Sequence, residues 1–91
     1  MSALLEKLVL YTVEPDTPHK DLPEKAIGIV LKGGHAFNSV LVDRFDDQNT
    51  VVSVRDITNK ERECHILVDE IAAILGPKSS TLFVRGVGQG S

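Results

Sequence analysis

The residues best suited to chemistry lie between positions 43 and 49, where the sequence reads DRFDDQN. The carboxylates of Asp43, Asp46 and Asp47 could act as general acid and base or hold a divalent cation. The segment lacks the repeated ligand spacing and the glycine of a calcium-binding loop. Aspartate and asparagine are also common turn formers. We therefore interpret this cluster as a turn rather than a catalytic or metal site.

The remaining reactive side chains form no constellation either. Cys64 and His65 are adjacent in a predicted strand, so their side chains point to opposite faces and cannot form a nucleophile–base pair. His19 lies in a polar loop without the convergent ligands that a metal needs. Residues 32–35, KGGH, lack the spacing of a phosphate-binding loop and are not followed by an obvious helix. The sequence predicts no enzyme, no metal site and no cofactor.

Composition indicates an ordinary soluble domain. The 91 residues, 42% of them hydrophobic and 25% charged, are expected to form one domain over 1–91 with a small core. The net charge of −3 excludes a general electrostatic attraction to nucleic acid, so any such site would be local. The chain has neither a transmembrane-length apolar run nor a signal peptide, and its single cysteine cannot form an internal disulfide. We expect a cytoplasmic protein that does not enter membranes.

The elements that would position these residues are mostly strands. Two runs of strand-forming residues, about 37–45 and 50–57, surround the turn cluster Asp46–Asn49 and predict an antiparallel hairpin. A strand over 26–31 precedes it, separated by a turn at Gly33-Gly34. Residues 63–68 and 81–84 are predicted to form further strands.

Other segments are less regular. Apolar spacing favours a short amphipathic helix over residues 3–10, with a strand as the alternative. Three prolines make residues 14–25 a polar, exposed loop. Residues 69–76 predict either a helix of one to two turns or a tight 3₁₀ turn followed by a short strand. From Arg85 onward the glycine-rich end is expected to be a flexible tail.

Short strands joined by tight polar turns predict a mainly β fold. We expect a small, strongly bent, five-stranded antiparallel barrel with the N-terminal helix over one open end. The competing class is an α+β sandwich, in which helices 3–10 and 69–76 pack on one face of the sheet.

Two stretches together resemble the signatures of the Sm-like family of small β-barrels. The first stretch runs from Leu31 to Asp56, and the second is Phe83-Val84-Arg85-Gly86. The parallel elements of the first are Leu31-Lys32, Gly34, Phe37, Leu41-Val42, Phe45-Asp46, Asn49 and Val52.

The resemblance implies a homo-oligomeric ring, formed by pairing the edge strands of neighbouring subunits, that binds single-stranded RNA. His35 or Phe37 would stack on a base, Asn49 would read its edge, and Arg85 would support the contact. Stacking and hydrogen bonding to splayed bases is the usual mode of RNA recognition. The alternative is a non-enzymatic, self-assembling module that binds a protein partner and has no RNA site. A third possibility is a subunit whose cleft binds a small ligand.

Overall fold

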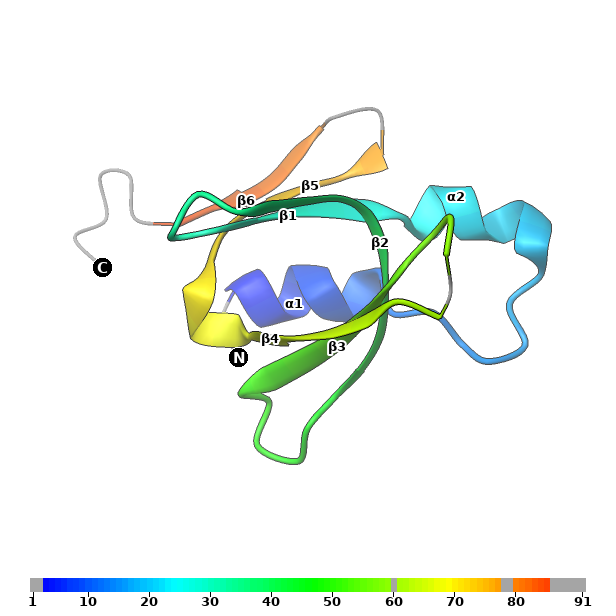
Figure 1. Ribbon diagram of the computed structural model, residues 1–91, viewed down its shortest axis with the longest axis horizontal. Coiled ribbons are helices and arrows are strands. Elements are labelled where there is room, and N and C mark those ends of the chain that lie inside the picture. The colour runs from blue at the N-terminus through cyan, green and yellow to red at the C-terminus, as the bar shows by residue number, and fades with distance from the viewer. Residues whose placement is uncertain (1–2, 60, 78–79, 86–91) are drawn as a thin grey trace.

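The computed structural model describes residues 3–59, 61–77 and 80–85 and shows a mainly β protein with one short N-terminal helix (Figure 1). The chain begins with helix α1 (Ala3–Leu10) and continues through the 3₁₀ turn η1 (His19–Asp21) and helix α2 (Leu22–Lys25). Three strands follow, β1 (Ile27–Leu31), β2 (Ala36–Phe45) and β3 (Val51–Asp56). The remaining elements are β4 (Glu63–Leu67), the 3₁₀ turn η2 (Val68–Glu70), β5 (Ile71–Leu75) and β6 (Thr81–Val84). The predicted mainly β class and N-terminal helix are thus confirmed.

All strands belong to one antiparallel sheet with the order β4-β3-β2-β1-β5-β6. In the described residues the sheet has six strands rather than the predicted five, because β5 pairs with β1 and adds a strand to the five segments predicted to be strands. The sheet is not closed, since β4 and β6 lie at opposite ends of the order. The predicted five-stranded barrel is therefore not confirmed.

The central hairpin forms as predicted. β2 pairs with β3 from Val40–Asp56 to Phe45–Val52, and the turn between the strands lies at the DDQN cluster. β2 buries Val40, Leu41 and Val42 in succession, because both of its faces are covered there, and it changes neighbours along its length. Its first half pairs with β1, whereas Val42 in its second half forms a parallel bridge with Thr12.

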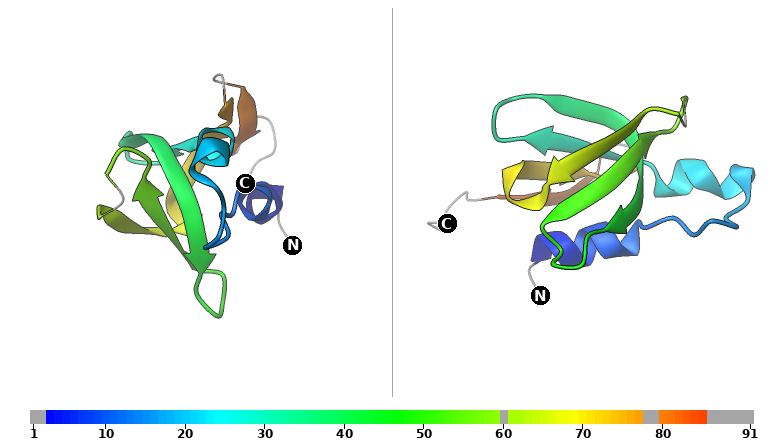
Figure 2. Two further views of the ribbon diagram at one scale, coloured as in Figure 1. Left: turned by 90° about the vertical axis from the view of Figure 1, so that its right-hand side faces the viewer. Right: turned by 60° about the horizontal axis from the view of Figure 1, so that its bottom comes forward.

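The core lies between the curled sheet and α1, which covers the open side of the curl (Figure 2). Leu4 and Leu8 of the helix are buried one turn apart, as the 3.6-residue period requires. They pack against side chains from the strands and η2. These are Ile27, Ile29, Val40, Val42, Val52, Val54, Ile66, Val68, Ile71 and Ile74.

Residues 14–25 form the predicted exposed loop only in part. They contain η1 and α2, and Leu22 is buried with Val13 against Leu41 on the other face of β2. The prolines exclude a long helix but allow a four-residue one, because Pro23 occupies its first turn and needs no amide donor there. The segment therefore acts as a cover for the second face of β2.

The segment 69–76 adopts the second of its two predicted forms. η2 is a single 3₁₀ turn, and β5 follows it directly and pairs with β1. The helix required by the competing α+β sandwich is therefore absent from this segment. Most of the predicted tail, residues 86–91, lies outside the described residues.

None of the helices in the described ranges has the length and apolar character that a membrane crossing requires.

Candidate functional site

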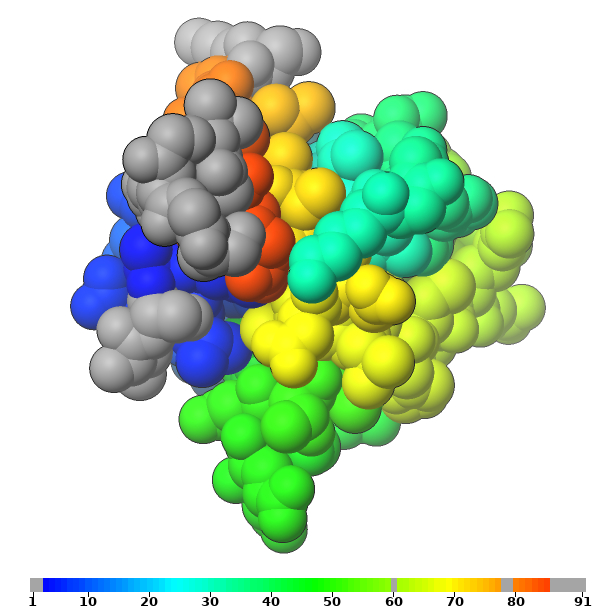
Figure 3. Space-filling model, turned by 90° about the vertical axis from the view of Figure 1, so that its left-hand side faces the viewer, coloured from blue at the N-terminus to red at the C-terminus, as the bar shows by residue number. Residues whose placement is uncertain are grey.

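Three distant segments meet at η2, at one end of the sheet. The Lys32 amide donates to the Glu70 carbonyl oxygen at 2.8 Å, and the Val68 amide donates to the Thr50 carbonyl oxygen at 2.9 Å. Arg85 also reaches η2, through its side chain. Figure 3 looks onto this end, with η2 in yellow at its centre and the β2–β3 turn in green below. The segments that carry the predicted RNA-binding residues therefore lie at the same end of the molecule.

Asn49 has a clear structural role in the β2–β3 turn. Its φ is +58°, in the left-handed region that asparagine tolerates better than most residues. Its amide donates to the Asp46 carbonyl oxygen at 3.0 Å, and the residue is exposed. The turn conformation accounts for an asparagine here, and base reading by Asn49 stays a prediction.

Arg85 already uses its guanidinium within the protein. Nε donates to the Ile71 carbonyl oxygen at 2.8 Å, and Nη2 lies 3.5 Å from the Val68 carbonyl oxygen. The guanidinium also lies 5.8 Å from the centre of the Phe83 ring. These contacts connect the end of β6 to η2 and the start of β5. Contact of Arg85 with RNA stays a prediction. Gly86, the second residue of the signature, lies outside the described residues.

His35 and Phe37 form an aromatic pair where β2 begins. Their ring centres lie 4.8 Å apart at an interplanar angle of 77°, an edge-to-face arrangement. Phe37 is half-buried against the core, while His35 is exposed. The structure thus brings these two predicted residues together, with Phe37 serving partly as a core residue.

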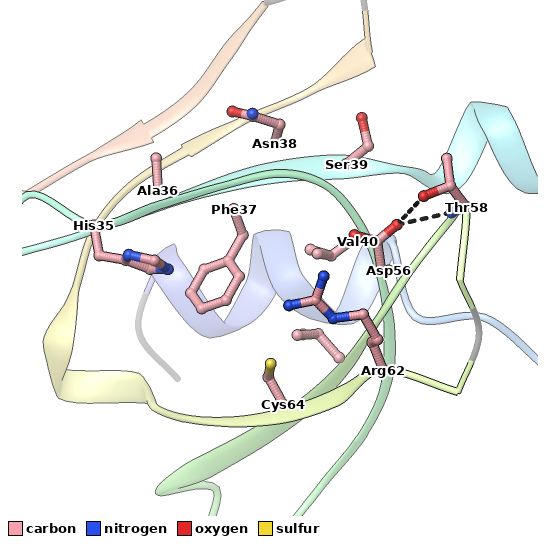
Figure 4. A pocket seen from close by; sticks show the side chains of 11 residues that line it. His35, Ala36, Phe37, Asn38, Ser39, Val40, Asp56, Thr58, Arg62 and Cys64 are labelled. Atoms are coloured by element: carbon pink, nitrogen blue, oxygen red, sulfur yellow. Dashed lines mark hydrogen bonds between the residues drawn. The ribbon is translucent and has the colours of Figure 1, made fainter.

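The aromatic pair borders a pocket of about 470 Å³ between β2, β3 and the start of β4 (Figure 4). The pocket opens because β3 pairs with β2 only from Val40 onward, so the strands diverge along the first half of β2. Val54 and Cys64 also line its apolar part. Neither Asn49 nor Arg85 lines this pocket.

Sequence reasoning missed three polar residues of the pocket, Asp56, Thr58 and Arg62. The Thr58 amide and hydroxyl donate to Asp56 Oδ1 at 2.8 and 2.6 Å. These hydrogen bonds, that from the hydroxyl first, hold the pKa of Asp56 below the ordinary aspartate value, and the positive charge of Arg62 adds to the effect. The Asp-x-Thr spacing could have predicted this local turn. It carries no sign of the pocket, which depends on strands folding together.

Asp46 organises the β2–β3 turn. Its Oδ1 accepts hydrogen bonds from the amides of Val51 and Thr50 at 2.8 and 2.6 Å, and its Oδ2 accepts from the Thr50 hydroxyl at 2.8 Å. The Val51 amide and then the Thr50 hydroxyl are the main reasons that the pKa of Asp46 is lowered. This supports the interpretation of the acidic cluster as a turn.

Two of the described arginines of the sheet are engaged in ion pairs. Arg55 Nε lies 2.7 Å from a carboxylate oxygen of Asp43, and Arg44 Nη1 lies 3.5 Å from Glu63 Oε2. Around η2, by contrast, several acidic side chains are exposed. They are Asp46, Asp47, Asp69 and Glu70. This end would therefore repel phosphate groups.

Cys64 and His65 lie on opposite faces of β4, as predicted. Cys64 is partly buried against the core, whereas His65 is exposed and its Nδ1 lies 2.9 Å from the Ser53 hydroxyl. Across residues 3–59, 61–77 and 80–85, no group of three or more His, Cys, Asp or Glu side chains could hold a metal ion.

Neither a scan against protein-family models nor searches of curated proteins and of solved structures finds a match to this chain.

Proposed function

We propose that the protein is a non-enzymatic interaction module that self-associates through the free edge of β4. The observation that carries the proposal is the position of β4 at the end of the strand order, where β3 is its only neighbouring strand within residues 3–59, 61–77 and 80–85. An edge strand presents unpaired backbone donors and acceptors, which readily pair with another chain.

The hydrogen-bond pattern shows which backbone groups of β4 face that edge. The Val68 amide bonds Thr50, and the Asp56 amide bonds Arg62, on either side of the β3–β4 ladder. Because partners in an antiparallel ladder alternate, Ile66 and Cys64 direct their backbone groups toward β3. The backbone groups of Glu63, His65 and Leu67 consequently point away from the sheet. Three residues of β4 are available to bind a further strand.

Exposed apolar side chains also support a role of the edge strands in self-association. Leu67 in β4 is 58% exposed, and Val84 in β6, at the other end of the sheet, is 48% exposed. Pairing β4 of one copy with β6 of the next would cover both and would be repeated head to tail. A head-to-tail contact closes into a ring when the rotation between copies permits it.

A ring of this kind would suit an Sm-like small barrel, and we assign the chain to that family as part of the proposal. The N-terminal helix, the strong bend of β2 and the 3₁₀ turn before β5 support the assignment (Figure 1). The six-stranded, open sheet departs from the five-stranded barrel of that family.

Leu67→Pro tests the assembly surface specifically. Leu67 has φ −69°, which proline adopts without strain, and its amide faces the free edge. The substitution removes an edge donor and an apolar side chain while leaving the ladder to β3 intact. We expect wild type to be oligomeric and Leu67→Pro monomeric by native mass spectrometry and sedimentation velocity.

Two further variants complete the experiment. Val84→Lys should also dissociate the assembly if β4 pairs with β6, and should leave it intact if β4 pairs with β4 of a second copy. Leu10→Lys, at a 62% exposed position on α1, is the control and should leave the mass unchanged. A monomeric wild type at micromolar concentration would refute self-association.

Binding of single-stranded RNA is a second candidate, favoured by the meeting of the Asn49 turn, the start of β2 and Arg85 around η2. The exposed acidic side chains at this end oppose it, because contacts to phosphate supply much of RNA affinity. Fluorescence anisotropy with U-rich and A-rich oligonucleotides at low salt tests the candidate. Asn49→Gly allows the left-handed turn conformation but removes the side-chain carboxamide. The substitution should therefore weaken RNA binding if Asn49 reads a base. If wild type binds no RNA, this candidate is refuted and the protein-interaction module is the function proposed.

A further inference from the structure

The pocket between β2 and β4 has the composition of a ligand site. Its volume of about 470 Å³ lies in the range of small-molecule pockets. Phe37, Val40, Val54 and Cys64 form an apolar wall, and Val40 and Val54 are almost fully buried. Such a wall suits an alkyl or aryl group.

The polar side of the pocket has unused donor capacity. Arg62 extends into the pocket beside Asp56, and its guanidinium makes no hydrogen bond or ion pair with any other described side chain (Figure 4). Its backbone is held in the β3–β4 turn by bonds to Asn59 and Asp56. Guanidinium groups bind carboxylates through two parallel hydrogen bonds. The Arg62 guanidinium could therefore donate hydrogen bonds to a ligand in the pocket.

Asp56 is not the hydrogen-bond acceptor for the Arg62 guanidinium. Its Oδ1 already accepts two hydrogen bonds from Thr58, and no ion pair joins it to Arg62 in the described ranges. The exposed ring of His35 adds a further polar group at the opposite end. A ligand would thus meet one cationic group with free donors next to an apolar wall.

We propose that this pocket binds an apolar carboxylate, with the carboxylate on the Arg62 guanidinium and the hydrocarbon on Phe37, Val40 and Val54. The carboxylate could belong to a free organic acid or to the C-terminal residue of a peptide, since both present the same group. This site is separate from the backbone groups of Leu67 at the free edge of β4. The proposal therefore goes beyond the proposed self-association.

The test is ligand titration of the full chain followed by amide NMR shifts. The probes are hexanoate, hexylamine as its charge-reversed match, and a short peptide ending in leucine as either free acid or amide. We expect saturable shifts with hexanoate at residues 36–39 and 62–64, and none with hexylamine. Arg62→Met should weaken hexanoate binding by about tenfold or more, because a charge-assisted hydrogen bond is lost.

Arg44→Met is the matched control, since Arg44 is an exposed β2 arginine that does not line the pocket. It should bind hexanoate as wild type does. Tighter binding of the free-acid peptide than of hexanoate would identify peptide C-termini as the source, and the reverse order would identify small acids. Absence of saturable shifts, equal binding of hexylamine, or an unchanged affinity in Arg62→Met would overturn the proposal.

Discussion

At the scale of single residues, two polar side chains singled out in the sequence, Asp46 and Arg85, form hydrogen bonds mainly with backbone groups. Asp46 accepts three hydrogen bonds from Thr50 and Val51, and Arg85 donates to two carbonyl groups around η2. Both residues belong to stretches that carry the Sm-like resemblance. Their contacts show that a polar residue at a turn or strand end can be required by the fold alone.

Asp46→Ala should lower the urea midpoint of unfolding, because three hydrogen bonds to the β2–β3 turn are lost. Asp47→Ala is the control, since Asp47 is its exposed neighbour and makes no hydrogen bond with the other described residues. Equal effects of the two substitutions would contradict a special role of Asp46.

The same carboxylate predicts a dependence of stability on pH. Hydrogen bonds lower the pKa of folded Asp46, so its contribution is complete above the unfolded value of about 3.9. The contribution is lost as the pH falls through the folded pKa. Below about pH 4, wild type should therefore lose stability more steeply than Asp46→Asn in urea titrations. Parallel curves for the two proteins would show that the turn does not depend on this charge.

Arg85→Met should destabilise the protein by about 1–3 kcal/mol, because carbonyl groups around η2 lose their donor. Chemical denaturation measures this, and Arg44→Met, at a 64% exposed side chain, should cost much less. A stability equal to that of wild type would make Arg85 available for a binding role.

At the scale of elements, α1 shows how a short amphipathic helix gains stability from packing. Leu8 is fully buried against the curled sheet, whereas Leu10 in the same helix is 62% exposed. An isolated eight-residue helix is not stable in water, so its formation depends on this burial.

Leu8→Ala should cost about 2–5 kcal/mol of unfolding free energy, through lost burial and the cavity left behind. Leu10→Ala should cost about 0.5 kcal/mol or less, as at other exposed positions. Both are measured by urea denaturation at neutral pH. Similar costs for the two leucines would mean that α1 is not docked on the sheet as described.

At the scale of the whole molecule, the open sheet leaves β4 with no neighbouring strand on one side among the described residues. A protein that binds a second copy only when folded becomes more stable as its concentration rises. The melting temperature of wild type should therefore increase with concentration, while that of Leu67→Pro should not. A constant melting temperature for wild type would argue against assembly through β4.

Features that depend on neighbours along the chain could be predicted from the sequence. Two runs of strand-forming residues around a turn cluster predicted the hairpin of β2 and β3, and apolar spacing predicted the bounds of α1. These patterns arise from backbone geometry within a few residues, so they can be read without knowing what the segments pack against.

Features that depend on contacts between distant segments could not be predicted from the sequence pattern and are seen only in the folded chain. Residues 68–75 form a turn and a strand because β5 pairs with β1. Leu22 is buried because it packs against Leu41 on the second face of β2. The pocket beside Arg62 exists because β2 bends away from β3. Such outcomes reflect contacts between residues far apart in sequence, for which the local pattern carries no signal.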